Sequence, residues 1–155
     1  MANNSRVNGN VFSNGNITGE NNSVITGDAM VAGGLPASPS VEWTAENSDQ
    51  FFATSSSNRD IAQSFTATAS GALPQVSVYL GKVGNPTNNI TLRITNDNGG
   101  QPATTSLASG QIAYTSVGST PSWIDVALSS PPTVTNGSKY WVVLDYGSNS
   151  ATNYW

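Results

Sequence analysis

The sequence predicts an all-β protein, in which a short N-terminal hexapeptide β-solenoid segment precedes an antiparallel, jelly-roll-like β-sandwich. A six-residue repeat runs through the start of the chain, runs of alternating apolar and polar residues follow it, and no window shows helical periodicity. Charged residues make up only 9% of the 155 residues, against about 25% in typical domains. Ser, Thr, Asn and Gly take their place, which is typical of exposed β-structure.

The repeat occupies residues 4–33, which divide without gaps into NSRVNG, NVFSNG, NITGEN, NSVITG and DAMVAG. Asn or Asp opens every unit and Gly closes four of them, and both tolerate the left-handed backbone angles of a tight corner. A triangular solenoid uses three such units per coil, so this segment has fewer than two coils, whereas repeat stacks need about three or more repeats. We therefore expect residues 1–33 to stack on another chain or on further coils. The expected assembly residues are Val7, Val11, Ile17, Val24, Met30 and Val31.

Composition changes after the repeat. Residues 34–41, GLPASPSV, form a predicted linker whose two prolines favour an extended path. Residues 42–155 carry all four tryptophans and all five tyrosines, and we expect them to form the β-sandwich. The final stretch SNSATNYW reads as an interrupted strand, so we expect a sandwich that is truncated at its C-terminal end.

Short alternating runs define the strands expected in the sandwich. Residues 83–88 are interpreted as a hairpin-type loop, residues 96–110 as a long irregular connection and residues 135–137 as a turn. The two clearest runs, QVSVYLGK and SWIDVAL, place aliphatic side chains on one face and Tyr79 or Trp123 on the other. The predicted strands are 64–68, 75–82, 89–95, 111–117, 122–128 and 139–146.

Composition also excludes several classes of function. The formal net charge is −4 and only five residues are basic, so no basic stripe is available for nucleic acid. Histidine and cysteine are absent, which removes the usual general base, the thiol nucleophile and the commonest transition-metal ligands. The nine carboxylates show no spacing that pairs two of them for catalysis. We therefore expect no enzyme, no cofactor and no membrane span in this chain.

The residues indicate two kinds of candidate binding site. Exposed aromatic rings bind sugars, and Trp141, Tyr79 and Trp123, beside Asp145 and Arg93, are the candidates for a carbohydrate platform. The alternative for Trp141 is a place in the core, because it lies in the most apolar strand.

Oxygen ligands in a glycine-rich loop suit calcium, and Asn96, Asp97 and Asn98 are the candidates for a structural calcium site. The alternative is a set of Asx turns, which the absence of a downstream Glu at calcium-loop spacing favours.

Residues 60–155 resemble the choice-of-anchor type of bacterial surface domain. The matching motifs, in order, are SFTAT, VYLGKVGNP, RITNDNGGQP, LASG, SSPPTVTNGSKYWVVLD and NYW. The hexad segment resembles the short β-solenoid pieces of bactofilin-like and pilin-associated proteins. The resemblance implies a β-sandwich module at the bacterial cell surface that belongs to a pilin-like or other surface-filament subunit, and it supplies no catalytic residues to carry over.

The sequence therefore predicts a structural, adhesive component of a bacterial cell surface or extracellular filament. Its expected partners are other copies of itself or another surface or filament subunit, and glycans. A carbohydrate-binding module and a phage fibre or receptor-binding domain are the alternatives. A threefold assembly through the hexads would favour the fibre, and an exposed aromatic groove would favour the carbohydrate module.

Overall fold

The computed structural model describes residues 6–8, 11–13, 24–25, 29–31, 41–42 and 49–155. The chain divides into two compact units, Met1–Ser40 and Val41–Trp155. Throughout these described ranges the regular structure is β-strand, apart from one 3-10 turn, η1 (Tyr114–Ser116). The predicted all-β class is confirmed.

The described residues of the first unit form four short strands that pair in parallel. β1 (Arg6–Val7) pairs with β3 (Val24–Ile25), and β2 (Val11–Ser13) pairs with β4 (Ala29–Val31). The predicted solenoid remains a prediction, since most of the hexad residues lie outside the described ones, as does the predicted linker except Val41. Of the expected assembly residues, Val7 lies in β1, Val11 in β2, Val24 in β3 and Met30 and Val31 in β4, whereas Ile17 lies outside the described residues.

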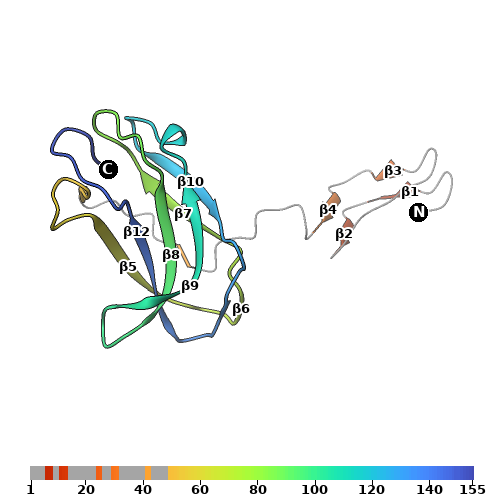
Figure 1. Cartoon of the computed structure of the whole chain (residues 1–155). Coiled ribbons are helices and arrows are strands. Elements are labelled where there is room, and N and C mark those ends of the chain that lie inside the picture. Colours follow the sequence, from red (N-terminus) through yellow and green to blue (C-terminus); the bar gives the residue numbers. More distant parts are fainter. Residues whose placement is uncertain (1–5, 9–10, 14–23, 26–28, 32–40, 43–48) are drawn as a thin grey trace. The chain divides into compact units, whose positions relative to one another are not determined.

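The second unit is an antiparallel β-sandwich. One layer is a four-stranded sheet with the order β5-β12-β8-β9. The other layer consists of two strand pairs, β7 with β10 and β6 with β11. Figure 1 shows β5, β12, β8 and β9 side by side, with β7 and β10 in the layer behind them. The strand bounds are β5 Asp60–Thr66, β6 Gly71–Ala72, β7 Gln75–Leu80, β8 Ile90–Asp97, β9 Pro102–Ile112, β10 Ser122–Ala127, β11 Thr133–Val134 and β12 Lys139–Asp145.

The core lies between the two layers. The alternating side chains Ile90, Leu92 and Ile94 of β8 are fully buried, because β8 is a central strand whose inner face meets the opposite layer. Burying one side chain of this size stabilises the fold by about 1.5–3 kcal/mol. The other large contributors are Phe52, Leu80, Ile112, Val117, Val126, Leu128, Leu144, Tyr146 and Trp155.

The layers approach each other closely where β9 meets β10, and this position requires a glycine. A Cβ atom on Gly110 would lie 2.5 Å from Val126 Cγ1 and 2.6 Å from the Ala127 carbonyl oxygen. Beside it, the Ser129 amide donates a hydrogen bond of 2.8 Å to the Ser109 carbonyl. The sandwich is therefore closed along this edge by direct contact between backbone segments.

Two sequence-based assignments in the middle of the chain are wrong. Residues 96–110 were expected to be irregular, but most of them form β9, the longest of the described strands. Their small polar residues show no apolar alternation, and the strand is held by backbone pairing with β8 at the edge of the sheet. A strand was expected over 111–117, but β9 ends at Ile112 and η1 follows it.

The loop at 83–88 is also not a hairpin. The strands on either side of it do not pair with each other, because β7 pairs with β10 and β8 pairs with β12 and β9. The loop therefore crosses from one layer to the other. The turn at 135–137 is confirmed, since Gly137 has a φ of 78° and the Ser138 amide donates to the Thr135 carbonyl at 3.0 Å.

Candidate functional site

Two aromatic side chains lie side by side on the outer face of the β7–β10 pair. Tyr79 and Trp123 are direct cross-strand partners, and their ring centroids are 5.4 Å apart with an interplanar angle of 57°. The side chains next to them in sequence turn inward, because Leu80 is buried and Ile124 packs against the core. Tyr79 and Trp123 are nevertheless 43% and 51% exposed, so their rings contact each other and still present surface to solvent.

A polar pair continues the same face. Ser77 and Asp125 are cross-strand partners two residues along from the aromatic pair, and the Ser77 hydroxyl donates a hydrogen bond of 2.5 Å to Asp125 Oδ1. Gln75 follows on the same side of β7, and all three residues are exposed. We call Tyr79, Trp123, Ser77, Asp125 and Gln75 the aromatic face. It combines ring surface with carboxylate, hydroxyl and amide groups on a rigid two-stranded scaffold.

The predicted carbohydrate platform is divided between the two layers. Tyr79 and Trp123 lie on the β7–β10 pair, whereas Trp141, Asp145 and Arg93 lie on β12 and β8 of the four-stranded sheet. Each group points away from the shared core, so the two groups lie on different outer faces of the sandwich. The structure therefore brings together the first two of the five predicted residues and separates them from the other three.

Trp141 is half-buried and is engaged by a carboxylate. Its indole Nε1 donates a hydrogen bond of 2.8 Å to Asp97 Oδ1. Its cross-strand partner on β8 is Thr95, which is fully buried although it is on the outer face of the sheet. Trp141 thus differs from both interpretations of the sequence, since it is neither in the core between the layers nor an open aromatic surface.

Asp97 serves the turn between β8 and β9. One carboxylate oxygen accepts the Trp141 indole proton, and the other accepts a hydrogen bond of 3.1 Å from the Gly100 amide. These hydrogen bonds, with that of Trp141 the stronger influence, hold the pKa of Asp97 below its ordinary value. Gly99 and Gly100 have φ values of 65° and 88°, which a glycine adopts without strain.

The predicted calcium ligands therefore lie in a hydrogen-bonded turn. Asn96 is exposed at the end of β8, and the Asn98 amide donates to the Gln101 carbonyl at 2.8 Å. Both oxygens of Asp97 already have donors within the protein. Across the ranges the structure describes, no group of three or more acidic residues is arranged to hold a metal ion. This arrangement matches the Asx-turn alternative for the loop.

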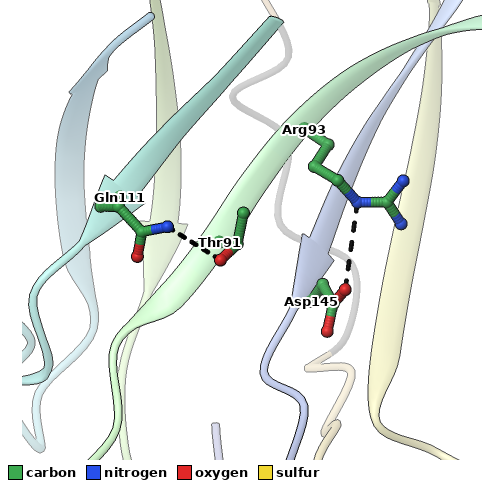
Figure 2. A network of polar contacts seen from close by, with 4 residues as sticks. All are labelled: Thr91, Arg93, Gln111 and Asp145. Carbon is green, nitrogen blue, oxygen red and sulfur yellow. Dashed lines mark hydrogen bonds and ion pairs between the residues drawn. The ribbon is translucent and has the colours of Figure 1, made fainter. Parts of the chain in front are cut away.

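The four-stranded sheet carries a polar network on its outer face, which Figure 2 shows. Arg93 Nε lies 4.0 Å from Asp145 Oδ2, and Gln111 Nε2 donates a hydrogen bond of 2.9 Å to the Thr91 hydroxyl. Asp60 lies directly opposite Asp145 on β5. These contacts join β5, β12, β8 and β9 across the sheet, which is the stabilising role of cross-strand pairs.

The Asp60–Asp145 pair is the one place in this network where like charges meet. The pKa of Asp60 is raised, first by burial of part of its carboxyl and then by the negative charge of Asp145 and a hydrogen bond with it. Arg93 and Arg59 partly offset this effect.

Sequence reasoning missed Ser77, Asp125 and Gln75 as members of a site. The alternation in QVSVYLGK and SWIDVAL placed Ser77 with Tyr79 and Asp125 with Trp123, so the signal for each strand was present. The missing information was that β7 and β10, more than 40 residues apart, are neighbours in register. Once that pairing is known, the five residues form one face.

No helix within the described part of the chain is long and apolar enough to cross a membrane. Comparison of the chain with known protein families, with curated proteins and with solved structures finds no match in any of the three.

Proposed function

We propose that this chain is a structural, adhesive component of a bacterial cell surface or extracellular filament, and that its sandwich binds carbohydrate on the aromatic face. The observation that carries the proposal is the exposed Tyr79–Trp123 pair. The extracellular location is supported by the Asn, Ser, Thr and Gly surface and by the resemblance to choice-of-anchor domains. The protein acts by binding and by assembly, without catalysis.

The geometry of the pair suits a sugar ring. The pyranose ring has apolar C–H faces that pack on aromatic rings, while its hydroxyl groups need hydrogen-bond partners at the edge. Tyr79 and Trp123 supply the ring surface. Asp125 and Ser77 lie beside them with oxygen acceptors, and Gln75 adds an amide. An apolar partner would cover the remaining acceptor positions of Asp125 and the amide of Gln75 without offering hydrogen bonds, which favours a sugar over a hydrophobic peptide.

Charge selects the class of sugar. The chain has a formal net charge of −4, and the charged member of the aromatic face is Asp125. An acidic polysaccharide would be repelled by this carboxylate, whereas hydroxyl groups of a neutral sugar donate to it. The proposed ligand is therefore a neutral polysaccharide or the neutral part of a surface glycan.

The test is retention of the protein by neutral polysaccharides in native affinity gels, with β-1,4-glucan, β-1,3-glucan, α-glucan, mannan and xylan as separate probes. The Trp123→Ala substitution removes most of the ring surface. We expect it to weaken retention by about tenfold or more, which corresponds to about 1.4 kcal/mol. Trp123→Tyr keeps an aromatic ring and should restore most of the retention.

Two control variants at other aromatic residues test whether the loss of retention is specific to the aromatic face. Phe51→Ala removes another exposed aromatic side chain, 48% exposed and in edge contact with Tyr154, and should leave retention unchanged. Trp141→Phe changes the aromatic residue of the other outer face and should also leave retention unchanged. If no probe retains the wild-type chain, or if Trp141→Phe abolishes retention and Trp123→Ala does not, the proposed site is wrong.

A further inference from the structure

The strand pairs of the first unit share one step along the sequence. Arg6 pairs with Val24 and Val7 with Ile25, so the partner of each β1 residue lies 18 residues later in β3. In the other pair, Val11 lies beside Ala29, and the step between β2 and β4 is again 18 residues. This step equals three of the six-residue units in the sequence. Both pairs are parallel, as strands on successive turns of one coil are.

The four strands leave backbone edges open within the described part of the chain. β1 and β3 form a two-stranded sheet, as do β2 and β4, so each strand is paired on one side. Proteins usually guard such edges with charged residues or proline. Here the sequences are RV, VFS, VI and AMV, so Arg6 is the single charged residue of the four strands and none contains proline. β3 and β4 contain neither a charged residue nor a proline that would protect their open edges.

The described part of the chain does not continue this pattern at the next step. The residue 18 positions after Val24 is Glu42, which is exposed, lies outside any strand and belongs to the second unit. Pro36 and Pro39 fall between them in the sequence, and proline lacks the amide that a continuing ladder needs. A strand that pairs with β3 on its open side is therefore not found among the described residues of this chain.

We propose that this strand belongs to a second copy of the chain, so that β3 and β4 of one copy pair in parallel with β1 and β2 of the next. The partner edge already fits, because β1 and β2 carry the spacing and direction to which β3 and β4 pair within one chain. The contact is head-to-tail, so it repeats and builds a filament. This inference rests on the proposed structural function and names the partner and the register of its assembly.

Cysteine cross-linking tests the register, because the chain has no native cysteine. Neighbouring strands lie about 4.8 Å apart, which is within the separation of roughly 4.4–6.8 Å between Cα atoms that a disulfide spans. Arg6→Cys and Val24→Cys are made in separate full-length chains with different tags, mixed, and oxidised in a glutathione buffer. Ser13→Cys and Val31→Cys give a second matched mixture, and Arg6→Cys with Val31→Cys is the mismatched control.

We expect each matched mixture to give severalfold more mixed-tag dimer than the mismatched mixture, with a yield that rises with protein concentration. Equal yields in all three mixtures overturn the proposal. A dominant same-tag Arg6→Cys dimer also overturns it, because that would indicate a twofold contact in place of a head-to-tail one. Dimers that form only when a different surface protein is added would assign the edge to another partner and overturn it as well.

The cross-linking experiment tests the assembly independently of the proposed carbohydrate binding. Repeating the matched mixtures on a Trp123→Ala background should leave the dimer yields unchanged, because Trp123 lies in the second unit. Polysaccharide retention without cross-linking would leave the binding proposal standing and remove the assembly. Cross-linking without retention would do the reverse.

Discussion

The outer faces of the two layers carry similar residues but use them differently. On the β7–β10 pair, Trp123 is 51% exposed and its aromatic partner is another exposed ring. On the four-stranded sheet, Trp141 is half-buried and its indole proton is held by Asp97. Both tryptophans alternate with aliphatic residues in their strands, so the difference comes from neighbours across the sheet. The β7–β10 face exposes its aromatic rings to solvent, whereas the polar groups on the other face form contacts that hold the four strands together.

The largest expected effect tests whether both faces depend on one core. Leu92 is fully buried between the layers, so Leu92→Ala should lower the free energy of unfolding by about 2–5 kcal/mol. Urea unfolding followed by tryptophan fluorescence measures this loss. Leu107→Ala is the control, because Leu107 is 38% exposed on β9 and its removal should change stability by no more than about 0.5 kcal/mol.

The two faces should be lost together in the Leu92→Ala variant. The proposed polysaccharide site lies on β7 and β10, which share one hydrophobic core with β8. We expect retention to fall at the same urea concentration as the fluorescence signal. Retention that survives after the four-stranded sheet has unfolded would show that the β7–β10 pair is stable alone, and the comparison of two faces on one core would fail.

Part of this organisation could be predicted from sequence. Strands with regular alternation, such as β7, β10 and β12, were placed within a few residues because their inner faces are apolar. β9 was missed because most of its residues are Thr, Ser, Ala and Gly, and its buried positions are the small residues Ala108 and Gly110 with Ile112 at the end, so the sequence shows no apolar alternation. The loop at 83–88 was misread because turn residues reveal a change of direction and not which strands then pair.

The candidate site was predicted only in part, because alternation shows which way a side chain faces but not which strands are neighbours. Tyr79 and Trp123 were chosen correctly as outward-facing rings, since alternation within each strand gives the face. Their grouping with Trp141, Arg93 and Asp145 needed knowledge of which strands share a sheet, and that depends on contacts far apart in sequence. The bond from Trp141 to Asp97 crosses 44 residues and left no local signal.

A smaller effect concerns pH and the polar network. The pKa of Asp60 is raised above its ordinary value of 3.8, so the folded protein keeps this proton to higher pH than the unfolded chain does. Its contribution to stability is present below that value and is lost as the pH rises through the folded pKa. The Asp60→Asn variant has no carboxyl group at this position, so it does not lose this stability as the pH rises. Thermal unfolding between pH 3 and pH 7 should therefore show the variant gaining stability relative to wild type as the pH increases.

Asp97, on the same sheet, gives stability a pH dependence of the opposite sign. Its pKa is lowered by the hydrogen bonds from Trp141 and Gly100, so its contribution is present above the ordinary value and is lost as the pH falls through the folded pKa. Asp97→Asn should therefore lose stability at neutral pH and converge with wild type in acid. Two variants with the same sign of pH dependence would contradict the assigned causes of these shifts.

The smallest effects give the sharpest contrast between the faces. Each face has one exposed cross-strand hydrogen bond, from Ser77 to Asp125 on the aromatic face and from Gln111 to Thr91 on the four-stranded sheet. Such pairs contribute roughly 0.2–1 kcal/mol. Ser77→Ala and Gln111→Ala should therefore lower the melting temperature slightly and to a similar extent.

Polysaccharide retention separates the two variants. Ser77→Ala removes a hydroxyl beside the rings and releases the Asp125 carboxylate from its fixed position, so retention should weaken by a factor of about 2–10, the range of one modest hydrogen bond. Gln111→Ala removes a bond of the same kind on the other face and should leave retention unchanged. Equal retention in both variants would mean that the polar half of the aromatic face does not contact the sugar, and the ligand would then be held by Tyr79 and Trp123 alone.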